Sequence, residues 1–95
     1  MQISRVERAI GPKTNGHIQR VTHAVKGNKT IQIGETIEHD KVTFREVITK
    51  GYNYFKRTFK SFDKNGKAIK GSEYTEELFG TEANSKNIRK FGVIR

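Results

Sequence analysis

Cationic and aromatic side chains alternate along residues 50–70, and their density makes this segment the first candidate for binding chemistry. It holds seven of the nineteen lysines and arginines and five of the nine aromatic residues, with Asp63 as its single acid. Lysine and arginine neutralise phosphates, and aromatic rings stack on flat bases. The segment therefore predicts contact with a nucleic acid.

The predicted nucleic-acid-binding residues come from this segment and from the basic residues near the C-terminus. The cations are assigned to phosphate contact and the two tyrosines to stacking on bases. The set is Lys50, Tyr52, Tyr54, Lys56, Arg57, Lys60, Lys64, Lys67, Lys70, Arg89 and Lys90, with Arg95 as a further cation. The type of nucleic acid, DNA or RNA, is left open.

Residues 52–62 fit either a helix or a strand. The spacing of their aromatic residues favours a helix, whereas their content of tyrosine, phenylalanine and threonine favours a strand. The turn formers between Asp63 and Gly66 favour the strand, because they predict a β-hairpin that returns through residues 67–70. We adopt the hairpin as the prediction.

Strand alternation divides the side chains of this hairpin between two faces. Lys56 and Lys60 fall on a polar, cationic face together with Tyr54. Arg57 falls on the opposite face with the phenylalanines, which we expect to be core residues. The cationic face is therefore the part of the hairpin that remains for a ligand. Strict alternation separates Arg57 from this face, although Arg57 is among the predicted binding residues.

The other segments indicate a mixed fold. The alternation in residues 2–10 is poor, residues 17–26 and 40–50 fit a helix or a strand, and residues 30–37 alternate as a strand. Residues 72–79 predict a short helix, because Ser72 can cap it, glutamates follow and Gly80 stops it. The prediction is one small α+β domain over residues 1–95, with an antiparallel sheet and one or two short helices.

Composition narrows the classes of protein that this chain can represent. The net charge is +9, which attracts nucleic acid or an acidic protein partner. The absence of cysteine excludes disulfides, thiolate metal sites and a cysteine nucleophile. No apolar run approaches the length that a membrane helix needs, and the first residues lack the apolar core of a signal peptide. We expect a cytoplasmic protein without a membrane partner.

Charge also comes in blocks along the chain. Residues 1–34 and 50–72 are strongly basic, whereas residues 73–82 hold four acids and no base. Folding can gather the basic blocks on one face, or it can intermix them with the acids in a salt-bridged surface. Both arrangements stay open at this point.

No residue pattern names a reaction. Phosphate-binding glycine loops and nucleophile elbows are absent, so we assign no catalytic residue, metal site or cofactor. His17 and His23 are not separated by the spacing of known zinc ligands. Adjacent residues around His39 would point in opposite directions on a strand, so they are not expected to bind one metal ion. The first hypothesis is a non-enzymatic nucleic-acid-binding module. The alternatives are a small phage or mobile-element accessory protein that occludes a protein partner, and a small basic endoribonuclease with His17 or His23 as its base.

Overall fold

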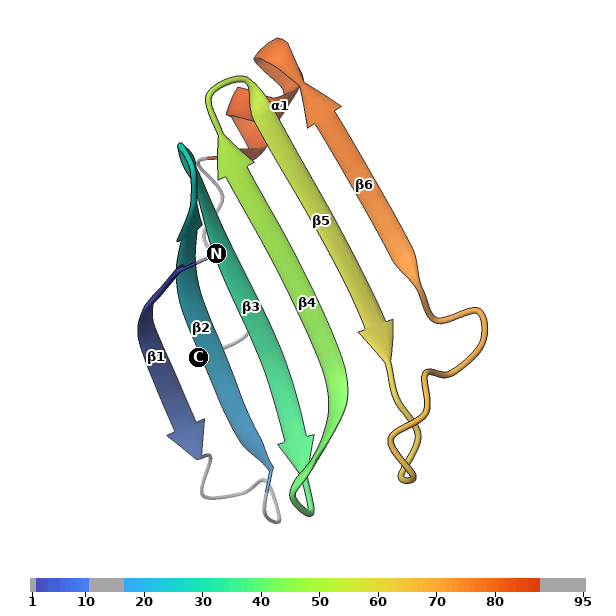
Figure 1. Cartoon of the computed structure of the whole chain (residues 1–95). Coiled ribbons are helices and arrows are strands. Elements are labelled where there is room, and N and C mark those ends of the chain that lie inside the picture. The colour runs from blue at the N-terminus through green and yellow to red at the C-terminus, as the bar shows by residue number, and fades with distance from the viewer. Residues whose placement is uncertain (1, 11–16, 88–95) are drawn as a thin grey trace.

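A six-stranded antiparallel sheet dominates the structure, a computed structural model that describes residues 2–10 and 17–87 (Figure 1). The strands follow one another across the sheet in chain order, so every pairing joins sequence neighbours. They are β1 (Gln2–Ile10), β2 (Ile18–Lys26), β3 (Lys29–Glu38), β4 (Lys41–Gly51), β5 (Tyr54–Ser61) and β6 (Tyr74–Phe79). One short helix, α1 (Gly80–Asn87), follows the last strand.

Tight turns allow this up-and-down arrangement. Gly27, with φ of 62°, lies in the two-residue connection between β2 and β3. His39 and Asp40, with φ of 51° and 65°, form the connection between β3 and β4. A left-handed backbone in a two-residue loop matches the twist of the flanking strands. Both ambiguous segments form strands, since β2 takes up residues 18–26 and β4 begins at Lys41.

The helix predicted over residues 72–79 is wrong, because most of this segment forms β6. Glu76 and Leu78 lie opposite Arg57 and Phe55 of β5, so charge and apolar pairing across the sheet outweigh the local helix signals. The hydroxyl of Ser72, the predicted cap, instead donates to the carbonyl of Ile69 at 2.6 Å. The helix begins only at Gly80, where the prediction ended it.

The turn between Asp63 and Gly66 is present, but the strand that pairs with β5 is not the predicted one. The amide of Gly66 donates to the Asp63 carbonyl at 2.9 Å. Residues 67–70 contribute a single bridge, between Phe62 and Ala68, whereas residues 54–59 of β5 pair with β6. The α+β expectation is met in its coarse form, a small antiparallel sheet domain with one short helix.

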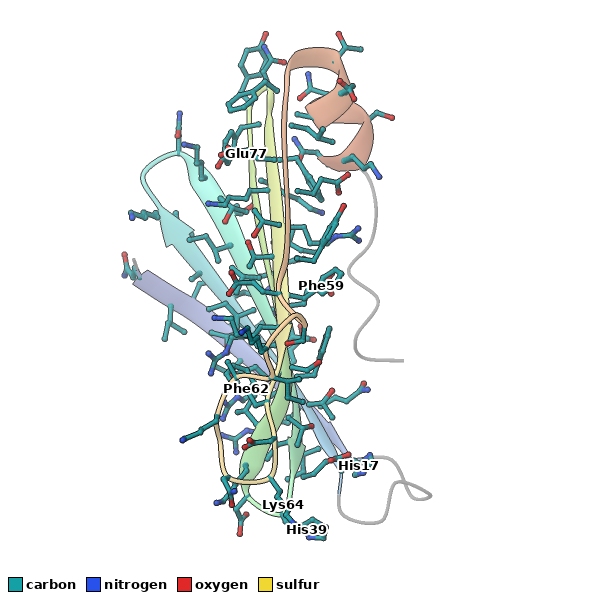
Figure 2. The ribbon with its side chains drawn as sticks, turned by 90° about the vertical axis from the view of Figure 1, so that its right-hand side faces the viewer. His17, His39, Phe59, Phe62, Lys64 and Glu77 are labelled. Atoms are coloured by element: carbon teal, nitrogen blue, oxygen red, sulfur yellow. The ribbon has the colours of Figure 1, made fainter. Side chains whose placement is uncertain are left out.

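The sheet has two different faces. Phe55, Arg57 and Phe59 lie on the face that α1 covers, which we call the helix face. Lys56 and Lys60 lie on the opposite face, which we call the lysine face. In Figure 2 the labelled side chain of Phe59 lies on the side of α1, and that of Glu77 on the other side.

A small apolar cluster joins α1 to the helix face. Ala83 of the helix is fully buried against Ile48 and Phe55, and Leu78 of β6 packs beside them. The side chain of Asn84 then fixes the helix to the β4–β5 turn, because its Nδ2 donates to Asn53 Oδ1 at 2.6 Å. The predicted core position of Phe55 is therefore confirmed.

The other phenylalanines of β5 and its C-terminal end are only half-buried. Phe59 packs between Phe44 and Tyr74, with ring centroids 6.0 and 5.0 Å away. Phe62 lies under the Arg45 guanidinium, 5.3 Å from the ring centroid. The main apolar packing of the sheet therefore depends on Phe55 more than on its neighbours.

Replacing Phe55 with alanine is expected to lower the free energy of unfolding by about 3–5 kcal/mol, because the ring is 2% exposed and fills the space under α1. Denaturant unfolding measures this change. Tyr52→Ala serves as the control, since that side chain is 87% exposed and its loss should cost less than about 0.5 kcal/mol. Equal effects of the two substitutions would contradict this account of the core.

Candidate nucleic-acid interface

Charge is divided unequally between the two faces of the sheet. Residues opposite each other in antiparallel strands share a face, so the pairings place every charged strand residue. Among the described strand residues, the lysine face carries the cations Arg8, Arg20, Lys26, Lys29, Arg45, Lys56 and Lys60 and the acids Glu35 and Glu77. The helix face carries Arg5, Lys41, Lys50 and Arg57 with Glu7, Glu38, Glu46 and Glu76. The strands thus contribute equal numbers of cations and acids to the helix face, and a large excess of cations to the lysine face.

The lysine face contains a cleft of about 460 Å³. Lys26 and Lys29 flank it at the β2–β3 turn, and Lys56 of β5 contributes from the other side. Its remaining described lining residues are Gly27, Asn28, Ile31, Thr49 and Tyr54, so none of them is acidic. Three lysines around one hollow are a suitable arrangement for an anion, because the fields of like charges add.

Tyr54 forms a wall of this cleft and helps to position a cation. The Lys29 ammonium lies 4.5 Å from the centroid of its ring, within the range of a cation–π interaction. The Tyr54 hydroxyl donates to Glu77 Oε2 at 2.5 Å, and this hydrogen bond raises the pKa of Tyr54. Phe79 meets the same ring edge-on, with centroids 5.5 Å apart. The neutral ring is thus held in place with Lys29 over one side of it.

Two of the predicted cations lie on the helix face, away from the cleft. Arg57 lies between Glu46 and Glu76, with N–O distances of 3.8 and 3.6 Å. These distances are too long for direct hydrogen bonds but place the guanidinium among acids. Lys50 is half-buried, and burial lowers its pKa. The alternation of β5 explains the position of Arg57, as its sequence predicts.

The remaining predicted residues lie at different places. Lys64, Lys67 and Lys70 are exposed in the β5–β6 connection, which follows the C-terminal end of β5, whereas the cleft lies at its N-terminal end. Figure 2 shows Lys64 at the end of the sheet that lies away from α1. An eight-residue strand separates the two places by about 25 Å. Lys60 forms an ion pair with Glu73 at 2.8 Å, and Tyr52 is exposed in the β4–β5 turn at the cleft end. The C-terminal candidates Arg89, Lys90 and Arg95 fall outside the described residues.

Sequence reasoning missed the lysines that flank the cleft from β2 and β3. Lys26 and Lys29 surround the turn formers Gly27 and Asn28, which is the pattern of a two-residue hairpin. A hairpin at this position would have placed both lysines on one face. The turn formers predict this hairpin only if residues 17–26 are interpreted as a strand, and their sequence also fits a helix.

A buried carboxylate organises the middle of the lysine face. Glu35 is 5% exposed and accepts from Arg20 Nε and Nη2 at 2.9 and 2.6 Å through one oxygen. Its second oxygen accepts from Arg45 Nε at 3.0 Å. One carboxylate neutralises one of the two guanidinium charges, so the cluster stays positive while its geometry is fixed.

His17 and His23 do not form a common site. His17 pairs with Glu38 and His23 with Glu7, each at 2.6 Å. Along an extended chain, the six-residue separation of the two histidines corresponds to about 20 Å, too far for joint action on one phosphate. Within residues 2–10 and 17–87, no cluster of three histidine or acidic residues is placed to hold a metal ion. The described part of the chain also contains no helix able to cross a membrane.

Comparison of the chain with protein-family models, with curated proteins and with solved structures finds no match in any of the three.

Replacing Glu35 with glutamine is expected to lower the free energy of unfolding by about 1–3 kcal/mol, because two charged donors lose their carboxylate. Denaturant unfolding gives the value. Asp40→Asn removes the same charge from an exposed turn, where asparagine tolerates the left-handed backbone, and should change stability by less than about 0.5 kcal/mol. A Glu35 variant as stable as the Asp40 variant would show that the cluster does not organise the face.

Proposed function

We propose that this protein is a non-enzymatic nucleic-acid-binding module that holds phosphates on its lysine face. The observation that supports this function is the gathering of seven strand cations on one face, while the opposite face is balanced. A surface of one sign attracts polyanions and raises the rate of encounter with them. The cleft lined by Lys26, Lys29 and Lys56 is the central contact.

The chemistry of the site favours contact with the phosphate backbone of a nucleic acid over the recognition of its bases. Lysine ammonium groups act as point charges and lack the planar fork with which arginine reads guanine. Arg20 already directs two of its donors to Glu35, and Arg45 directs its Nε to the same carboxylate. Binding should therefore depend strongly on salt and weakly on sequence. Tyr52, exposed beside the cleft, is the residue available for stacking on an unpaired base.

An acidic protein surface is the second candidate ligand, because the same seven cations would complement it. The protein would then act as an accessory that occludes a partner. A small basic endoribonuclease with His17 or His23 as its base stays the third candidate. A cytoplasmic location remains a prediction from the composition of the chain.

Removing the cleft lysines should weaken binding more than removing the same charge elsewhere. The test compares the triple variant Lys26→Gln, Lys29→Gln, Lys56→Gln with the matched triple variant Lys64→Gln, Lys67→Gln, Lys70→Gln. Fluorescence anisotropy with labelled single-stranded and duplex oligonucleotides of DNA and RNA, over a series of salt concentrations, gives the affinity. The cleft variant should lose at least about tenfold in affinity and reduce the log–log salt slope by about 2–3.

The matched variant carries the same net charge, so it should lose clearly less affinity and less slope. Equal losses in the two variants would mean that net charge alone governs binding. If the unaltered protein binds none of the oligonucleotides at low salt, the nucleic-acid proposal is wrong. A protein partner captured from nuclease-treated lysate by the unaltered protein but not by the cleft variant would then support the occlusion function.

A further inference from the structure

The sheet ends in two edge strands, β1 and β6, that are suited to pairing with each other in a neighbouring copy. Because six antiparallel strands alternate in direction, the two edges run in opposite directions (Figure 1). A second copy in the same orientation would therefore place its β1 antiparallel to β6 of the first copy. The alternation of the sheet would continue across the junction without interruption.

The hydrogen-bonding pattern fits the same junction. The Gly80 amide donates to the Asn53 carbonyl at 2.9 Å, and alternation along β6 then directs the backbone groups of Thr75 outward. Near the other edge, Lys26 and Lys29 close the two-residue hairpin as a hydrogen-bonded pair. This pair fixes which residues of β2 direct their backbone groups toward β3 and which direct them toward β1. It follows through the register of β1 and β2 that the backbone groups of Val6 point outward.

Exposed apolar side chains are concentrated on these two strands. Ile3 of β1 is 59% exposed and Phe79 of β6 is 65% exposed, with Val6 and Tyr74 also exposed. Such side chains at a sheet edge lose contact with water when another strand is added. The edges therefore gain apolar burial as well as hydrogen bonds from pairing.

The net charges at the two edges are of opposite sign. β1 carries the exposed cations Arg5 and Arg8 with one acid, Glu7, whereas β6 holds Glu76 and Glu77 without a cation and is preceded by Glu73. If Val6 of one copy lies opposite Thr75 of the next, Arg8 lies opposite Glu73 and Arg5 opposite Glu76. Each pair shares a face of the sheet, and both pairs join opposite charges. Pairing of two β6 strands would instead bring glutamates together.

We infer that copies of this protein associate head to tail through the pairing of β1 with β6. The contact is heterologous, because it joins two different edges. A pair of copies therefore still has a free β1 at one end and a free β6 at the other, and the series extends beyond a dimer. Consecutive copies present their lysine faces on the same side, since opposite residues share a face. The inference goes beyond the proposed function, because the junction forms from edge residues and needs no nucleic acid.

Sedimentation velocity on the full chain, treated with nuclease and freed of nucleic acid, tests this assembly. At low ionic strength, the unaltered protein should form species larger than a dimer as its concentration rises. Arg8→Glu and Glu73→Arg should each weaken association at least tenfold, because each places like charges at the junction. Combining both substitutions in one chain exchanges the charges, and this double variant should recover the association.

The control is Lys70→Glu, which makes the same change in charge as Arg8→Glu but lies in the β5–β6 connection, and it should assemble like the unaltered protein. Circular dichroism of every variant confirms the fold, which matters most for Glu73→Arg because Glu73 also pairs with Lys60. A protein that stays monomeric at every concentration overturns the inference. So does a series that stops at a dimer, since two β1 edges can also pair with each other. Failure of the double variant to recover association overturns the pairing of Arg8 with Glu73.

Discussion

The two-residue alternation of an antiparallel strand is the constraint on which the rest of this structure depends. Because opposite residues in neighbouring strands share a face, the five antiparallel pairings carry one assignment of faces across the whole sheet. A slip of one residue between β4 and β5 would move Arg57 to the lysine face and Lys56 to the helix face. The register therefore decides which charges meet a ligand and which meet one another.

The different chemistry of the two faces follows from what covers them. α1 packs on the helix face, where Ala83 and Phe55 exclude water. A charge near such a cluster is costly unless an opposite charge lies beside it, and Arg57 accordingly lies between two glutamates. On the lysine face, cations outnumber acids, and Glu35 holds two guanidiniums in place without cancelling both charges. This excess of charge supports the proposed binding of phosphates.

Local sequence patterns predict part of this arrangement. Alternation places Lys56 and Arg57 on opposite faces, and the turn at Asp63 and Gly66 is present. The helix over residues 72–79 is wrong, because a cap and a run of glutamates are local signals, whereas the pairing of Glu76 with β5 is not local. Lys26 and Lys29 were missed for a related reason, since residues 17–26 have no preference strong enough to exclude a helix. Pairing with a neighbouring strand decides whether such a segment becomes a helix or a strand, and a short window of sequence does not reveal that neighbour.

Mapping of backbone amide shifts by NMR, with a short oligonucleotide added to the isotope-labelled protein, tests the central claim most directly. The account predicts that the largest changes lie around the cleft, at Gly27, Lys29 and Lys56, with smaller ones along the rest of the lysine face. The amides of residues 63–71, at the other end of β5, should change little. Changes concentrated at residues 63–71 or around Arg57 on the helix face would contradict the account.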